Sequence, residues 1–274
     1  MIRLVRILVA VAFTVVSVIF VKYYIGEVRS RDDTYPVITI EGDLIEVNTK
    51  GDKENLLKGV SAYDGKDGDI TDRVIVESIS RFFEKGVCKI TYAVCDSDNH
   101  VASASRKIKY KDYSSPKFTL SRPLLFGLGE RVNLSAIVGS VDQIDGNISG
   151  SVIVTSSDYK AGQVGVFHID LKVSNTKGDI ATLRLPMRVE EKENGAPVIT
   201  LKENIVYTKV NKKLSLAKYI ESVTDIEGND IPVENVKIDS EIKYKEEGAY
   251  SVYYSVADSA GIQGSTLLTV VVES

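Results

Sequence analysis

Three stretches of this sequence share one alternating pattern, and that pattern decides the fold: GVCKITYAVCD at 86–96, GVFHIDLKVSN at 165–175 and GAYSVYYSVAD at 248–258. Every second residue in them is apolar, and the residues between are mostly polar. In the first stretch the apolar positions are Cys88, Ile90, Tyr92 and Val94. Alternation with a period of two predicts a strand with one buried face and one wet face, as in an antiparallel sheet packed on a partner.

Each stretch leads into a turn and then into a second alternating strand. The turns are DSDNH at 96–100, NTKGD at 175–179 and DSAGI at 258–262. After the first turn, ASASRKIKY at 102–110 alternates again. This order predicts that a β-hairpin closes each of three domains.

The chain beyond about residue 31 repeats at intervals of roughly 80 residues. An opening strand recurs as PVITI at 36–40, PKFTL at 116–120 and PVITL at 197–201. A second block recurs at 56–71, 134–149 and 216–231. The joins at 111–115 and 190–196 are short and polar and are typical of inter-domain linkers.

The repeats predict four segments: 1–30 with a cytoplasmic stub, an anchor and a juxtamembrane stretch, and repeats 1, 2 and 3 at 31–113, 114–194 and 195–274. Several short strands and a closing hairpin in about 80 residues indicate a small β-sandwich. The fold class is therefore all-β. Placed end to end, three such domains would form a rod on the order of 100 Å long.

The second block leaves its local structure open. Leu56 stands four residues before Val60, and the same spacing recurs in the other two repeats. This spacing suits one helical turn or an irregular strand equally well.

The composition narrows the class of function. Hydrophobic residues make up 43% and charged residues 26%, and the net charge is −4, which is unlike the clustered basic excess of a nucleic-acid-binding surface. With two histidines and two cysteines, the chain has few of the side chains that most enzymes use. Cys88 and Cys95 would lie about 23 Å apart along one strand, far beyond disulfide reach. We expect no enzyme, and a binding or structural role.

The N-terminus carries an uninterrupted apolar run from Ile7 to Val21, which neighbouring residues extend to about 20, the length that crosses a bilayer core. Arg3 and Arg6 precede it, as in a signal-anchor that keeps its N-terminus in the cytoplasm. The alternatives are a cleaved signal peptide and a buried helix of a soluble protein. Bulky residues at 20–25 offer no small-x-small cleavage site, which favours a transmembrane anchor.

The order PVIT[IL], then DxxDGDIT, then GxYx[IV]xYxVxD resembles the bacterial immunoglobulin-like repeats found in tandem on cell-surface proteins and as accessory modules of pesticidal crystal toxins. The resemblance covers about residues 33–274. Repeat 1 carries the aspartate motif in full at 64–71, repeat 2 softens it, and repeat 3 has an extra residue. The resemblance implies three tandem immunoglobulin-like sandwiches in an extracellular setting, and it implies no particular ligand.

The aspartates of repeat 1 are candidate calcium ligands, because hard cations bind six to eight oxygens. The candidates are Asp64, Asp67, Asp69, Asp96 and Asp98. The alternative is that these residues only form turns, through hydrogen bonds from backbone to side chain. We expect no other cofactor. His100 lies five residues after Cys95, but nothing nearby supplies the orienting group that a catalytic pair needs.

Together these features predict a single-pass protein of the bacterial cell membrane with its C-terminal domains outside the cell. It would act as a structural stalk or protein-interaction module, with an envelope or surface protein as partner and no nucleic acid. The alternative is a carbohydrate-binding adhesin that recognises wall or host glycan through surface tyrosines. Tyr110, Tyr113, Tyr159 and Tyr253 are the candidates for exposure. Tyrosines grouped on one face would favour the adhesin.

Overall fold

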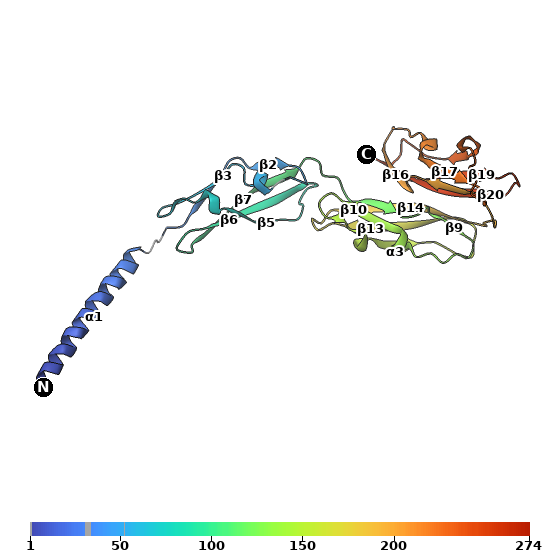
Figure 1. Cartoon of the computed structure of the whole chain (residues 1–274). Coiled ribbons are helices and arrows are strands. Elements are labelled where there is room, and N and C mark those ends of the chain that lie inside the picture. Colours follow the sequence, from blue (N-terminus) through green and yellow to red (C-terminus); the bar gives the residue numbers. More distant parts are fainter. Residues whose placement is uncertain (1, 31–33, 52) are drawn as a thin grey trace. The chain divides into compact units, whose positions relative to one another are not determined.

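The computed structural model describes residues 2–30, 34–51 and 53–274. The chain begins with helix α1 (Ile2–Ser30), whose segment Arg3–Gly26 is long and apolar enough to cross a membrane. No side chain of Arg3–Gly26 is buried within the protein, and Figure 1 draws this segment as one continuous helix in blue. A helix of this composition is stable when lipid or another apolar partner covers it.

The rest of the chain is almost entirely β-structure, and repeat 1 forms a sandwich of two sheets. One sheet has the order β1 (Val37–Ile40), β3 (Val60–Asp64), β4 (Gly68–Asp69). The other has the order β2 (Leu44–Val47), β7 (Val101–Tyr110), β6 (Val87–Cys95), β5 (Ile75–Ile79). A core cluster that includes Cys88, Ile90, Tyr92 and Ile108 fills the space between them.

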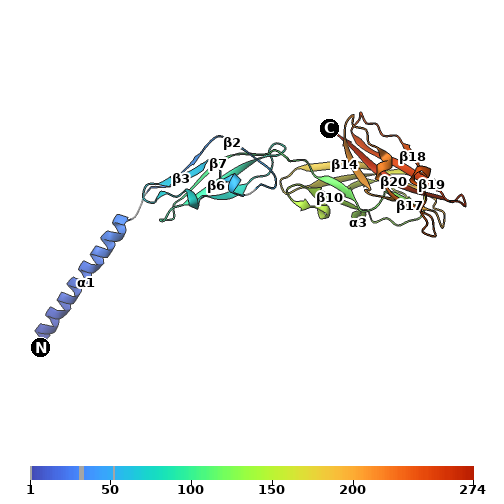
Figure 2. The ribbon, with the colours of Figure 1, turned by 45° about the horizontal axis from the view of Figure 1, so that its top comes forward.

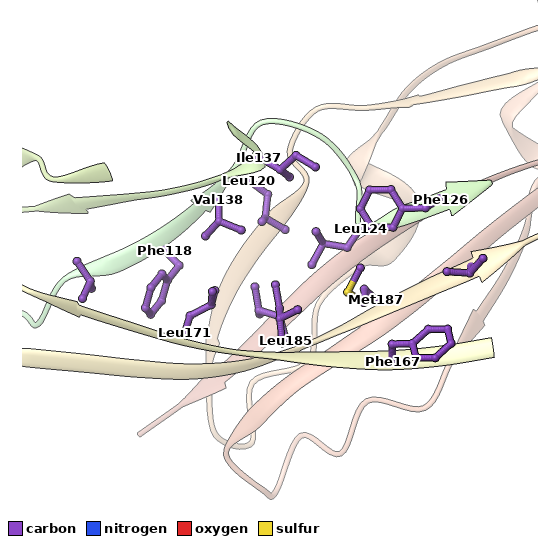
Figure 3. Packing of buried hydrophobic residues seen from close by; sticks show 13 residues of the cluster. Phe118, Leu120, Leu124, Phe126, Ile137, Val138, Phe167, Leu171, Leu185 and Met187 are labelled. Atoms are coloured by element: carbon purple, nitrogen blue, oxygen red, sulfur yellow. The ribbon is translucent and has the colours of Figure 1, made fainter. Parts of the chain in front are cut away.

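Repeats 2 and 3 have the same two-sheet plan. In repeat 2 the sheets are β8 (Lys117–Leu120), β10 (Val138–Asp142), β11 (Gly146–Asn147), and β12 (Ile153–Ser157), β13 (Gly165–Ser174), β14 (Ile180–Glu190), β9 (Leu125–Gly127). In repeat 3 they are β15 (Val198–Leu201), β17 (Ile220–Thr224), and β16 (Ile205–Lys209), β20 (Gln263–Glu273), β19 (Gly248–Ala257), β18 (Lys237–Ser240). Figure 3 shows the core of repeat 2, where Phe118, Leu171 and Leu185 meet between the sheets.

The alternation in the sequence is confirmed as the basis of this fold. The alternating stretches are β6, β13 and β19, and the predicted hairpins are the antiparallel pairs β6–β7, β13–β14 and β19–β20. The strand after the opening one pairs in parallel with the last strand of each repeat, as β2 does with β7. Cys88 is buried in the core and Cys95 is exposed.

The second block contains both structures that its spacing allowed. A short helix comes first: α2 (Lys53–Leu56), α3 (Leu134–Ile137) or the 3-10 helix at Leu216–Tyr219. A strand follows directly in repeats 2 and 3 and after three further residues in repeat 1. The leucine four residues before the strand therefore belongs to a single helical turn that leads into it.

Two compact units make up the chain, and one of them contains both repeat 2 and repeat 3. Within this unit β14 lies beside β19, as both views show (Figures 1 and 2). Ile205 and Ala249 of repeat 3 pack against the core cluster of repeat 2. The end-to-end placement considered from the sequence therefore does not apply to these two repeats, which pack side by side.

Polar contacts hold the same junction at both ends. The Tyr207 hydroxyl donates to the carbonyl of Phe118 at 3.0 Å, and Lys117 pairs with Glu273 at 2.9 Å. The carboxylate of Glu190 accepts hydrogen bonds from the hydroxyls of Tyr253, at 2.9 Å, and of Ser265. The sequence predicted that Glu190 lies in a linker. In the structure it is the last residue of β14, and its side chain bonds repeat 2 to repeat 3.

Candidate functional site

The predicted acidic residues of repeat 1 lie in two neighbouring turns at one end of the sandwich. Asp64 ends β3, and its Oδ1 accepts the backbone N–H groups of Lys66 and Asp67, both at 2.9 Å. Gly68 then turns the chain with φ 75°, a conformation that glycine adopts without strain. The Asp69 carboxylate accepts the N–H of Thr71 at 3.0 Å. Hydrogen bonding from the Thr71 side chain, and then from this N–H, lowers the pKa of Asp69.

Asp67 connects the two turns. Its carboxylate accepts the hydroxyl and the backbone N–H of Ser97, at 2.7 and 2.8 Å, and pairs with Arg73 at 2.8 Å. The hydrogen bond from the Ser97 hydroxyl is the largest cause that lowers the pKa of Asp67. Because Ser97 lies in the turn after β6, this carboxylate fixes one loop of the sandwich to another.

Asp96 organises the second turn. Its Oδ1 accepts the N–H groups of Asp98 and His100, at 2.9 and 2.7 Å, and its Oδ2 lies 2.8 Å from Nδ1 of His100. Burial acts to raise the pKa of Asp96, and the hydrogen bonds from His100 outweigh it and lower the pKa. Asp98 pairs with Lys66 at 2.6 Å. Two of the five predicted residues, Asp67 and Asp98, thus join the two turns, and each of the five carboxylates has a protein partner.

Among the residues that the structure describes, no group of three or more His, Cys, Asp or Glu side chains has an arrangement that could hold a metal ion. One feature still sets this end apart. Oδ2 of Asp64 is buried and has no hydrogen-bond partner, and Asp64 as a whole is 1% exposed. Calcium at these turns stays a prediction from the sequence.

Repeat 2 shows how the same position is satisfied elsewhere in the chain. Asp142 occupies the place of Asp64, and its Oδ2 accepts Nδ2 of Asn175 at 3.1 Å. Asn175 also donates to the Tyr113 hydroxyl, which in turn donates to Asp179 at 2.7 Å. In repeat 1 the position of Asn175 is held by Asp96, a carboxylate that offers no N–H group. Because repeat 1 has Asp96 where repeat 2 has Asn175, Oδ2 of Asp64 lacks the N–H donor that Oδ2 of Asp142 has.

The tyrosines considered for sugar binding are engaged with the protein. Tyr113 belongs to the network just described, and Tyr253 donates to Glu190. The Tyr159 hydroxyl donates to the carbonyl of Glu130 at 2.7 Å, and its ring packs edge-on against Phe126 and Phe167. Tyr110 is half-buried, edge-on to Phe82. These four tyrosines therefore do not form a free platform.

An exposed patch that the sequence reasoning missed lies on the outer face of the β1–β3 sheet. Tyr35, Val37 and Tyr63 are 65%, 63% and 63% exposed, and Val37 stands directly opposite Tyr63 across the two strands. The ring of Tyr35 lies against His100, with 4.7 Å between the ring centroids. We call Tyr35, Val37 and Tyr63 the tyrosine patch. A comparison of the repeats could have found the patch in the sequence. At the equivalent positions repeat 2 has no aromatic residue but Ser115, Lys117 and Val141.

Comparisons with known proteins give distant similarities. No family model matches the sequence. An uncharacterised 81.3-kDa protein of Acholeplasma phage L2 is 25% identical over 135 residues, which is 48% of this chain and 18% of the phage protein. This chain is therefore similar to less than a fifth of that protein.

Among solved structures, one with a carbohydrate-binding module in complex with GlcNAc and INT domains from Clostridium perfringens ZmpB is 23% identical, over 54% of this chain and 26% of that one, with a TM-score of 0.23. Drosophila N-cadherin EC1-4 is 13% identical, over 89% and 68%, with a TM-score of 0.25. The β-sandwich fold is confirmed by the sheets of the structure itself, and membership of the bacterial repeat family stays a prediction.

Proposed function

We propose that this chain is a membrane-anchored, non-catalytic protein of the bacterial cell surface, whose immunoglobulin-like domains act as a stalk or a protein-interaction module. The observation that supports the proposal is the unburied apolar helix Arg3–Gly26 at the head of a series of β-sandwich domains. Arg3 and Arg6 at its start favour a cytoplasmic N-terminus, and large domains after a span are translocated regardless of their charge.

Fractionation and protease accessibility test the anchor. We expect the full chain to stay in the membrane after an alkaline wash, and protease added to intact spheroplasts to digest the domains. Val15→Arg with Val16→Arg places two charges at the centre of the span, at about 2.5–3.5 kcal/mol each, and should release the chain. Val5→Arg near the start of the helix is the matched control and should not. A mature N-terminus beyond residue 25 would show a cleaved signal peptide and overturn the anchor.

The partner is tested with the anchored chain as bait for envelope proteins. A saturable protein partner whose binding is lost on removal of one repeat would support the interaction module. A second candidate function is a carbohydrate-binding adhesin, which the tyrosine patch favours, since sugars stack on exposed aromatic rings. The adhesin would become the better candidate if the chain retains wall or host glycan, if Tyr63→Ala abolishes that retention, and if no protein partner is found.

A further inference from the structure

The tyrosine patch is confined to the repeat that follows the apolar helix. At the three patch positions repeat 2 has Ser115, Lys117 and Val141, and repeat 3 has Ala196, Val198 and Thr224. Lys117 is partly buried in its own unit, where it pairs with Glu273 and lies over the ring of Tyr207. The common fold therefore does not require aromatic residues at these positions.

The length of the chain keeps the patch near the end of the candidate span. From Gly26 to the helix end at Ser30 the backbone advances about 6 Å. From Ser30 to Tyr35 it extends at most about 17 Å. Tyr35 therefore lies within about 23 Å of the end of the span, and a headgroup layer of roughly 5–8 Å borders the hydrocarbon there.

The chemistry of the patch suits that layer. A tyrosine ring is apolar and its hydroxyl is polar, so tyrosine is enriched where membrane meets water. In the patch two such rings flank the aliphatic Val37, and the Tyr35 ring is supported by His100. Three large side chains more than 60% exposed in one place on a small domain are costly to leave in water.

We infer that the tyrosine patch docks on the lipid headgroup layer of the membrane that α1 spans, and so holds repeat 1 against the bilayer. This inference rests on the proposed anchoring of the chain. The docking adds a second, weaker contact beside the span, as aromatic belts do at the ends of membrane helices. Repeat 1 is then the membrane-bound domain, and the surfaces of repeats 2 and 3 are left to bind other partners.

Energy transfer from repeat 1 to the membrane surface tests the docking. The full chain is placed in lipid nanodiscs with a donor dye on Cys95, which is exposed and directly precedes the turn that contains His100. Cys88 is buried and does not compete for the dye. Acceptor dyes are attached to the lipid headgroups. Docking holds the donor close to the acceptors and gives high transfer.

The test variant carries the residues of repeat 2: Tyr35→Ser, Val37→Lys and Tyr63→Val. Since exposed side chains are replaced by those of a homologous position, its melting curve should match the parent. We expect the ratio of docked to undocked protein to fall on the order of a hundredfold, with low energy transfer. Val198→Lys, the equivalent of Val37→Lys in repeat 3, should leave the transfer unchanged.

Equal energy transfer in the parent and the triple variant would overturn the inference. Loss of glycan binding in the triple variant with unchanged transfer would also overturn it and assign the patch to sugar. Co-elution with the nanodiscs tests the anchoring separately from the docking, because a chain that is not inserted does not co-elute with them. A variant that co-elutes, melts normally and has lost transfer supports the docking.

Discussion

The last strands of repeats 1 and 3 occupy the same place in the fold and have opposite outer faces. On β7 the outward residues are Ser103, Ser105, Lys107 and Lys109, and all four are exposed. At the equivalent positions of β20 they are Ser265, Leu267, Thr269 and Val271, and the last three are buried. On the inner faces Arg106 and Ile108 of β7 and Leu268 and Val270 of β20 are all buried, so the difference in exposure lies in what covers the outer faces. Water covers the outer face of β7, whereas repeat 2 packs beside that of repeat 3.

A charge introduced at one pair of equivalent outward positions should affect the two strands most differently. Leu267→Asp places a carboxylate in the covered face, and we expect the free energy of unfolding of the second unit to fall by about 4 kcal/mol. Because separation of repeats 2 and 3 would relieve the buried charge, the melting curve should split into two transitions. Ser105→Asp is the matched control on the open face, with an expected change within about 0.5 kcal/mol. Equal effects of the two substitutions would mean that the face of repeat 3 is not covered.

Loss of the Glu190 carboxylate should have the next largest effect. Glu190→Ala removes the acceptor of Tyr253 and Ser265, and we expect a loss of about 2 kcal/mol in denaturant unfolding of the second unit. Combination with Tyr253→Phe should be non-additive by about 1 kcal/mol, because both remove the same hydrogen bond. Glu46→Ala breaks an exposed pair with Lys111 and should change little. Strict additivity of the first two substitutions would show that the bond contributes nothing.

Low pH should weaken repeat 1 through its acidic turns. The pKa values of Asp67, Asp69 and Asp96 are lower in the folded protein than in the unfolded chain, so their contribution is complete above about pH 4. It is lost as the pH falls through the folded-state values. Asp67→Asn should lower the unfolding temperature of repeat 1 by several degrees at pH 7 and reduce its dependence on pH below 4. An unchanged pH profile would show that the hydrogen bonds from Ser97 do not stabilise the fold.

We expect the smallest change in stability when the acidic turn of repeat 1 is given the asparagine of repeat 2. Asp96→Asn supplies the N–H group that Asn175 gives to Asp142, and its new donor would face Oδ2 of Asp64. The same change removes the ionised oxygen that lies 2.8 Å from Nδ1 of His100. Without calcium we therefore expect the gain and the loss to offset each other, with a change in unfolding temperature of no more than about a few degrees. If the turns bind calcium, the ion should stabilise the parent in thermal unfolding, and Asp96→Asn should abolish that stabilisation. A fall of more than about ten degrees without calcium would show that the buried oxygen gains no partner.

Most of the architecture could be predicted from the sequence. The alternation of apolar and polar residues in β6, β13 and β19 is satisfied by a strand with one buried and one exposed face. The covered face of repeat 3 has a sequence signal that the sequence analysis did not use: the run LLTVV at 267–271 is typical of a strand buried on both sides. No pattern identified repeat 2 as its cover, since the partner of an apolar face is not encoded locally. The acidic residues were found by type, but their hydrogen bonds to Ser97 and His100 depend on how two distant turns meet. Tyr35 and Tyr63 emerged only when equivalent positions of the repeats were compared.

The parallel pairing of β2 with β7, and of its counterparts in the other repeats, has a mechanical consequence. In each repeat an early strand lies beside the last one and points the same way, so a pull on the two chain ends slides the strands past each other. Their evenly spaced hydrogen bonds are then loaded together, and they must break together rather than one after another. A protein tethered at one end and drawn from the other by flow or by a moving partner would resist that force in every repeat.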